Sequence, residues 1–272
     1  MATTIIKPKK MFSWNDIREL WAYKELMYFF TWRDLKVRYK QTIVGAGWAI
    51  FQPLMTMFVF TVFFGNLAKM PSDNVPYPIF IYTGLLFWNF FSSALGDTSN
   101  CLISNQAIIT KVYFPRLILP ISSVLTKIVD FSIAFLVLGV LMIYYGFMPN
   151  LIGVLIIPLL LLITFMASVG LGLFLASINV KYRDLRYILP FFVQMLMYLT
   201  PVIYPASIAG EYSWLLAINP MTGVIQNARA AILNTAVINW NLIFISLIAC
   251  LALLAFGTYS FKKTERYFAD VI

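Results

Sequence analysis

The sequence predicts an all-α polytopic membrane protein with about six membrane-spanning helices. Hydrophobic residues make up 61% of the 272 residues and charged residues only 11%, which is more apolar surface than one soluble core can bury. Several apolar runs approach the roughly 20 residues that a helix needs to cross a bilayer. A β-barrel would instead show short segments of alternating hydrophobicity, so we do not expect that class.

Six apolar runs are expected to be the spans. The region between the fifth and sixth has intermediate hydrophobicity, and its apolar pieces are too short to cross a bilayer, so we expect short outer helices there. The third and fourth runs are separated only by the tight turn GFMPN, which leaves no room for a further domain. The expected spans cover residues 47–65, 78–99, 121–145, 151–178, 187–204 and 240–261.

Basic residues gather on one side of this topology. Of the 20 Lys and Arg, nine lie between the start and Lys40, two in the second loop, three in residues 181–186 and three in the tail. Only Lys69 and Arg229 fall in the opposite loops, and Lys127 falls within a span. The positive-inside rule then places both termini in the cytoplasm. The formal charge of +9 therefore reflects topology and not nucleic-acid binding, which requires a basic patch on a soluble face.

Residues 13–40 are expected to form an amphipathic helix that lies on the cytoplasmic surface of the membrane. Its apolar side chains recur at helical spacing, as Trp14, Ile17, Leu20 and Trp21 show, and the segment is rich in aromatic residues. A soluble helix packed against a partner is the alternative interpretation.

The start of the chain, MATTIIKPKKMFSW, carries charges where a signal peptide has its apolar core, so we expect no cleavable signal. No Gly/Ser linker or repeat divides the chain. We therefore expect one permease domain over residues 1–272, with residues 1–40 as a cytoplasmic and interfacial segment and 41–272 as the membrane bundle.

Composition argues against catalysis by this chain. Histidine is absent, which removes the commonest general base and imidazole metal ligand, and the two cysteines in or beside apolar runs suit small apolar fillers. We expect no catalytic residues and no metal site. The phosphate-loop pattern GxxxxGK[ST] is also missing, so any ATP-driven activity needs a second polypeptide.

Three segments resemble the type-2 ABC permeases that export surface polysaccharides, the Wzm and TagG group. They are RDLKVRYKQTIVGAGWAIFQPLMTMFVFTVFFG from Arg33, NQAIITKVYFPRLILPISSVLTKIVDF from Asn105, and DLRYILPFFVQMLMYLTPVIYP in the fifth span. The resemblance implies a homodimer in the bacterial inner membrane with two ATPase subunits that bind ATP and Mg. It also implies a lipid-diphosphate-linked glycan as cargo, foremost O-antigen, with teichoic acid and capsule as alternatives.

The segment from Asn105 is similar to that family's loop between the second and third spans, and a short helix in it, at about Gln106 to Tyr113, is expected to dock on the ATPase. The resemblance therefore implies a coupling role for this loop, whereas an ordinary positively charged cytoplasmic loop is the alternative. The residues expected to carry the contact are Gln106, Lys111, Tyr113, Phe114 and Arg116.

A diphosphate headgroup needs cations where the surface helix meets the bilayer, and Arg binds phosphate oxygens bidentately whereas Lys acts more as a point charge. Simple retention of this segment in the cytoplasm explains the same charges without a ligand. The headgroup candidates are Arg33, Lys36, Arg38 and Lys40.

A glycan presents apolar C–H faces that slide over aromatic side chains, although aromatic residues also face lipid freely. Amides inside a span are stronger candidates, because they are costly against lipid. The expected channel-lining residues are Trp48, Phe51, Gln52, Phe58, Phe191, Phe192, Gln194 and Tyr198.

Ionisable residues within the spans are Lys127 and Asp130 in the third span, with Asp97 near the cytoplasmic end of the second. Lys127 and Asp130 are three residues apart on one helix face, so we expect them to pair as a structural anchor.

Two other functional classes remain open from the residues. An ion-coupled secondary transporter is disfavoured by the lack of an inverted repeat, and a lipid-modifying membrane enzyme by the lack of histidine. A neighbouring ATPase gene among glycosyltransferase genes would favour export.

Overall fold

The structure is a computed structural model, and it describes residues 14–40, 45–182, 184–234 and 236–265. Every regular element in these ranges is a helix and none is a strand, so the all-α class is confirmed. Our expectations for residue 13, for Arg183 in the basic loop and for the tail beyond Glu265 lie outside the described residues.

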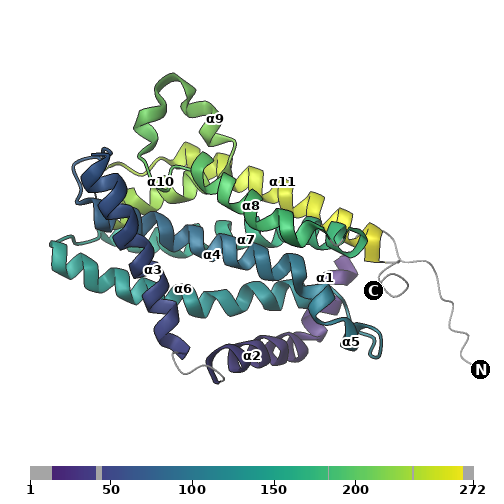
Figure 1. Cartoon of the computed structure of the whole chain (residues 1–272). Coiled ribbons are helices and arrows are strands. Elements are labelled where there is room, and N and C mark those ends of the chain that lie inside the picture. The colour runs from purple at the N-terminus through teal and green to yellow at the C-terminus, as the bar shows by residue number, and fades with distance from the viewer. Residues whose placement is uncertain (1–13, 41–44, 183, 235, 266–272) are drawn as a thin grey trace, which may run out of the picture.

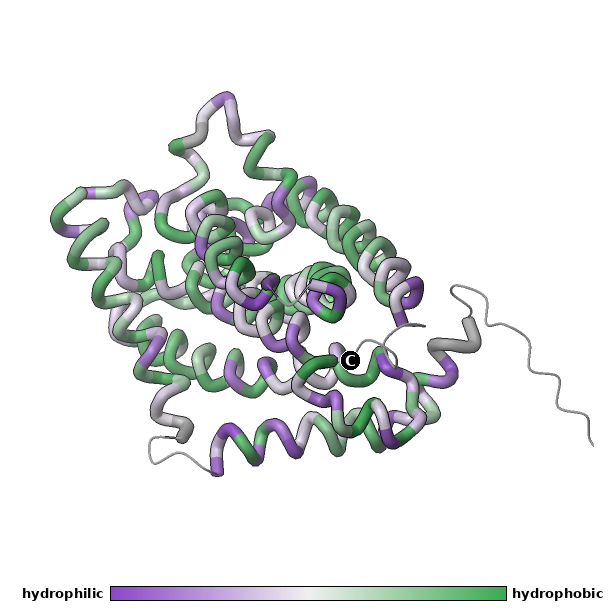
Figure 2. The backbone as a smooth tube through the Cα atoms, turned by 45° about the vertical axis from the view of Figure 1, so that its right-hand side comes forward, coloured by the Kyte–Doolittle hydropathy of each residue, from purple (hydrophilic) through white to green (hydrophobic). Residues whose placement is uncertain are grey.

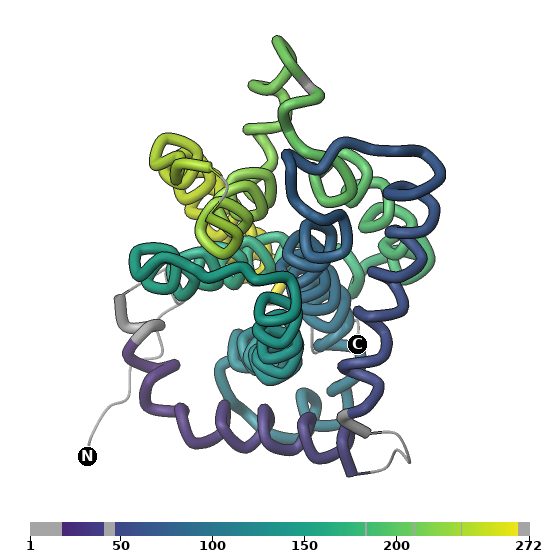
Figure 3. Tube along the Cα trace, turned by 90° about the vertical axis from the view of Figure 1, so that its left-hand side faces the viewer, coloured from purple at the N-terminus to yellow at the C-terminus, as the bar shows by residue number. Residues whose placement is uncertain are grey.

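The amino-terminal segment forms two helices, α1 (Trp14–Ala22) and α2 (Lys24–Lys40). The expected face of α1 is described only in part, because the side chains of Trp14 and Ile17 lie outside the described residues. Figure 3, which looks along the long helices, shows α2 running across the view beneath α6 (Ile118–Tyr145). This crossing orientation suits a helix that lies along a membrane surface.

Five helical segments in the described ranges are long and apolar enough to cross a membrane. Most of them extend past the spans expected from hydropathy. The first combines α3 (Gly45–Phe60) with the π-helical segment η1 (Thr61–Leu67). The others are α4 (Tyr77–Ser104), α6, α7 (Leu151–Lys181) and α11 (Trp240–Glu265). Figure 2 shows that these helices are largely hydrophobic, whereas hydrophilic residues are frequent along α2.

The fifth expected span, residues 187–204, is shorter in the structure. Helix α8 (Leu185–Leu199) has 15 residues, or about 22 Å at 1.5 Å per residue, against a hydrocarbon core of about 30 Å. It ends because Thr200 precedes Pro201 and adopts an extended conformation, as residues before proline favour. The following residues turn back into the protein, where Val202 and Ile203 are buried.

Short helices fill the region between α8 and α11, as expected. They are η2 (Ala206–Tyr212), α9 (Ser213–Ala217) and α10 (Pro220–Leu233). The Asn219 side chain caps α10 by accepting a hydrogen bond from the Met221 amide at 3.0 Å. The same side chain donates to Thr200 Oγ1 at 2.7 Å and so links α10 to the end of α8. Helix α9 stands away from the bundle (Figure 1), whereas α10 is largely buried.

Helix α4 is the centre of the core, and it packs against α6 on one side and α7 on another. Helix α7 also packs closely on α11. A Cβ atom on Gly257 would overlap the carbonyl group of Gly170, so only glycine permits this approach. Small residues commonly allow such close contact between membrane helices, where packing replaces the hydrophobic driving force.

The two ends of the bundle differ. The short helix α5 (Gln106–Ile109) and the end of α11 lie at one end (Figure 1), where Arg116 donates a hydrogen bond to the Glu265 carbonyl oxygen. At the other end α6 and α7 are joined by a turn in which Gly146 has φ 74°, a left-handed conformation that glycine adopts readily.

Candidate functional site

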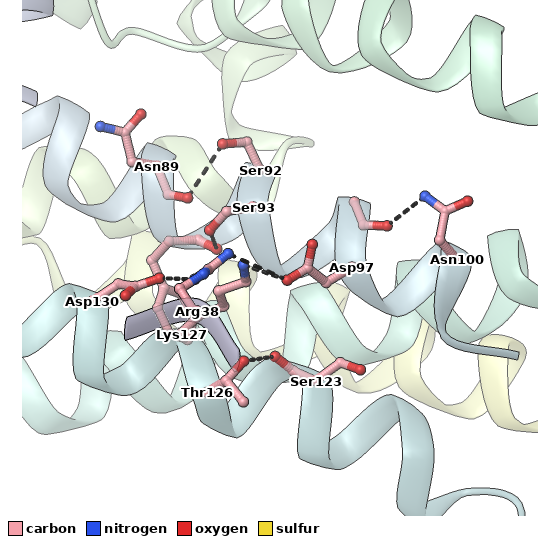
Figure 4. Close-up of polar contacts among 12 residues, drawn as sticks. Arg38, Asn89, Ser92, Ser93, Asp97, Asn100, Ser123, Thr126, Lys127 and Asp130 are labelled. Carbon is pink, nitrogen blue, oxygen red and sulfur yellow. Dashed lines mark hydrogen bonds and ion pairs between the residues drawn. The ribbon is translucent and has the colours of Figure 1, made fainter. Parts of the chain in front are cut away.

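A cluster of four charged residues joins α2, α4 and α6 (Figure 4). Lys127 lies on α6 with only 1% of its side chain exposed, and its ammonium group forms a salt bridge with Asp97 of α4. Arg38, near the end of α2, forms a salt bridge with Asp130 of α6 and lies 3.7 Å from Asp97 Oδ2. The two cations and two carboxylates compensate one another.

Tyr39 adds a neutral hydrogen-bond donor to this cluster. Its hydroxyl donates to Asp130 Oδ1, while Arg38 binds Oδ2 of the same carboxylate. Burial and the hydrogen bond to Asp130 raise the pKa of Tyr39, so the phenol stays protonated and can donate. The end of α2 is thus fastened to α6 by two adjacent side chains.

The expected pair between Lys127 and Asp130 takes a different form. Lys127 binds Asp97, and Asp130 binds Arg38 and Tyr39. Sequence spacing identifies partners on the same helix only, whereas the packing of α4 and α2 against α6 brings in partners from elsewhere. The expected pairing of Lys127 with Asp130 is therefore corrected, because each of the two residues binds a partner on another helix.

A cavity of about 870 Å³ adjoins this cluster, between α3, α4 and α6 and the end of α2. Arg38, Tyr39, Lys127 and Asp130 form its charged edge. The remaining wall combines aromatic, aliphatic and uncharged polar side chains. They are Trp48, Ala49, Gln52, Pro53, Tyr82, Leu86, Asn89, Phe90, Ser92, Ser93, Phe131 and Ala134.

The channel-lining candidates fall into two groups. Trp48 and Gln52 border this cavity, whereas the other six do not. Those six lie on exposed parts of α3 and α8, and they are Phe51, Phe58, Phe191, Phe192, Gln194 and Tyr198.

The four headgroup candidates all lie on α2 but have different surroundings. The Arg33 guanidinium binds Asp34 at 2.7 Å, donates to Asn105 Oδ1 at 2.8 Å and lies over the Phe30 ring. Lys36 lies over the Trp32 ring. Arg38 belongs to the charged cluster, and Lys40 is exposed at the end of the helix.

The loop expected to couple to an ATPase has a base that packs against the bundle and a tip that is exposed. Phe114 is buried and packs on Phe30 of α2 with ring centroids 5.7 Å apart, and Arg116 binds the end of α11. Gln106 is exposed at the start of α5. The exposed tip of the loop consists of Lys111, Val112 and Tyr113.

Several residues of the site were missed in the sequence. Asn89, Ser92 and Ser93 were hidden within an apolar run, although a polar amide inside a span was a usable signal. Arg229 was counted among the outer loops, yet it is buried. Among the described residues no group of three or more Cys, Asp and Glu side chains is placed to hold a metal ion.

The salt bridge between Lys127 and Asp97 leads to a first prediction. Asp97→Asn is expected to cost about 1.5–3 kcal/mol of stability, because the buried ammonium loses its charged acceptor. Adding Lys127→Met should restore most of the loss, since the apolar stem stays and the unpaired charge disappears. Thermal unfolding of the four proteins in detergent measures this cycle. Asp184→Asn, which makes the same change at an exposed carboxylate, is the control. An equal loss of stability in Asp97→Asn and in the double variant with Lys127→Met would contradict the pairing.

Comparisons with known proteins agree with this architecture. The model of the family described as ABC-2 type transporter matches residues 25–233, from α2 to the end of α10. The chain is 28% identical to the O-antigen export system permease protein RfbA of Klebsiella pneumoniae over 91% of this chain and 95% of that protein.

Two further relatives extend the comparison. The RfbA protein of Myxococcus xanthus, also an O-antigen export system permease, is 32% identical over 79% of this chain and 82% of its own. The polysialic acid transport protein KpsM of Escherichia coli is 22% identical over 74% of this chain and 78% of its own. The family match therefore covers the helices that form the cavity and the loop between α4 and α6.

Proposed function

The chain belongs to the ABC-2 type transporter family, and from this premise we propose that it is the membrane-spanning subunit of an exporter for lipid-linked O-antigen. One observation carries the choice of cargo: the chain resembles O-antigen export permeases over 91% of its own length. It is a multi-pass inner-membrane permease and not an enzyme. Its five long apolar helices provide the membrane bundle.

Energy for export comes from separate ATPase subunits that bind ATP and Mg. This chain offers them the loop tip at Lys111, Val112 and Tyr113, which is exposed while the residues behind it are anchored. That tip and the end of α11 lie at the same end of the bundle, which suits a single cytoplasmic face there.

A second copy of the chain completes the transport path. Helix α3 is largely unburied, and α8 exposes Phe191, Phe192 and Gln194. An exposed amide at the depth of the hydrocarbon core is costly against lipid, so the Gln194 side of α8 suits a wet path between two copies better than the bilayer. Aromatic rings along that path offer faces over which sugar rings slide.

The diphosphate that links glycan to lipid meets the cations of α2. Lys36 and Lys40 are exposed and carry this contact, whereas Arg33 is already paired with Asp34 and Arg38 with Asp130.

Two alternatives are weaker. Similarity to the polysialic acid transport protein supports a capsule-type cargo at lower identity, 22% against 28–32% for the O-antigen permeases. An ion-coupled transporter uses titrating carboxylates within its spans, whereas Asp97 and Asp130 are both engaged with cations.

Export in proteoliposomes tests the proposal. The full chain and its ATPase are reconstituted with lipid-linked O-antigen, and ATP is added outside. We expect ATP-dependent movement of the glycan into the lumen, measured as protection from an external oxidant. Liposomes with the ATPase alone are the control, and lipid-linked polysialic acid is the competing cargo. Export driven by an ion gradient without ATP, or restricted to polysialic acid, would refute the proposal.

A further inference from the structure

The cavity between α3, α4 and α6 has a chemical character that the transport path alone does not explain. We propose that it is a subsite within each protomer that holds a sugar ring of the cargo close to its lipid anchor. This inference rests on the proposed function for the identity of the cargo. The site itself is argued from its walls.

The volume suits a small ligand. At about 870 Å³ the cavity lies within the roughly 300–1,000 Å³ of typical small-molecule sites. It is bordered by the last turn of α2, so a ligand within it would lie beside the helix that carries the proposed headgroup cations. The sugar ring of a lipid-linked glycan that is nearest the lipid lies next to the diphosphate, so it would occupy this position when the diphosphate binds α2.

Two amides in the wall lack partners. Among the residues that the structure describes, neither the Gln52 nor the Asn89 side chain forms a hydrogen bond, and Figure 4 shows the Asn89 amide pointing away from the charged cluster. Both would lose hydrogen bonds to water if an acyl chain filled the cavity. A ligand with several hydroxyl groups satisfies them instead.

Hydroxyl groups of the wall extend this surface. Ser92 and Ser93 donate to the carbonyl oxygens of Asn89 and Phe90, both at 3.3 Å, which leaves the lone pairs of the serine oxygens as acceptors. Amides that donate and accept, next to hydroxyls that accept, form the complement of a sugar's hydroxyl groups.

The charge balance argues against an anion as the main occupant. Arg38 and Lys127 are the two cations of the wall, and each already forms a salt bridge with a carboxylate. A phosphate entering the cavity must break these pairs, whereas a neutral ring leaves them intact. Aromatic side chains of the wall, such as Trp48 and Phe90, supply apolar faces for the ring's C–H groups.

Photocrosslinking of the full chain in lipid nanodiscs tests this site. Three probes carry the same dodecyl chain and diazirine, with a glucoside, a phosphate or a plain hydroxyl as headgroup. We expect the glucoside probe to label cavity peptides of α3 and α4 about fivefold more than the hydroxyl probe, the effect of roughly one retained hydrogen bond.

Variants then locate the contact. Asn89→Leu and Gln52→Leu are expected to reduce glucoside labelling about fivefold each. Asn241→Leu makes the same change at an exposed position on α11, away from the cavity, and should not reduce it. Melting temperatures of the variants confirm that they remain folded.

Each other outcome has a definite meaning. Equal labelling by all three probes would identify a groove for acyl chains, and preference for the phosphate would identify an anion site; either result overturns the inference. Export by the wild-type proteoliposomes is measured in parallel. Failed glucoside labelling with normal export would refute the sugar subsite alone, whereas specific labelling without export would refute the proposed function alone.

Discussion

Replacing Arg229 with methionine is expected to destabilise the chain by roughly 3–5 kcal/mol, because several buried carbonyl groups lose their donor at a cost of about 1–3 kcal/mol each. The Arg229 guanidinium donates to the carbonyl oxygens of Pro201 at 2.8 Å and Val202 at 2.5 Å, and to that of Phe80 at 3.3 Å. It also lies over the Phe80 ring, 3.6 Å from the centroid. No carboxylate of the described residues forms a salt bridge with it.

These contacts explain why the loss is large. Helix α8 ends at Leu199, so the carbonyl groups that follow have no helical partners, and the turn that carries them is buried. Arg229 satisfies several of them at once with its planar fork of donors. Methionine fills a similar length but donates nothing, which leaves buried acceptors unpaired.

Thermal unfolding in detergent measures the effect. The stability of Arg229→Lys should lie between those of the wild type and Arg229→Met, because an ammonium group keeps the charge but lacks the planar fork of donors. Gly84→Ala should act in the same direction as Arg229→Met, since a Cβ there would collide with Nη2 of Arg229. Lys69→Met removes an exposed cation of the same outer region and should change stability by less than about 0.5 kcal/mol. A stable Arg229→Met protein would show that the turn needs no donor.

Hydropathy predicts the long helices well, because a long run of apolar residues must be covered by lipid or by other helices, whatever the order of the residues within it. It predicts α8 less well. The apolar run continues through Val202 and Ile203, but the backbone leaves the helix at Thr200 and the run is buried as a turn. Here the apolar run is longer than the helix, because Thr200 precedes Pro201 and adopts an extended conformation.

Individual roles depend on contacts between helices, and these are not visible in one sequence. The sequence identifies Lys127 as unusual for a span, but its partner Asp97 lies on another helix. Arg229 counts as an outer cation by position, although α10 folds inward and buries it. The clustering of Gln52 and Asn89 at one cavity likewise requires the packing of α3 on α4.

Tyr113→Glu is expected to abolish coupling to the ATPase while leaving the chain folded. Tyr113 is 77% exposed at the loop tip, so the substitution disturbs no internal packing. A carboxylate at the centre of a docking surface must be desolvated without a partner, and aromatic residues at such centres often carry much of the binding energy. We expect export to fall at least about tenfold, which corresponds to a loss of about 1.4 kcal/mol.

The position of the loop residues decides which variants are informative. Phe114→Glu would place a carboxylate in the buried contact with Phe30 and damage the fold, so its loss of export would not identify a docking role. Tyr212→Glu makes the same change as Tyr113→Glu at a residue 69% exposed in η2, at the outer end, and should export normally. Because the tip is anchored through Phe114 to α2, force on it reaches the helix whose end borders the cavity. Normal export by Tyr113→Glu would therefore refute both the proposed docking surface and this route of coupling.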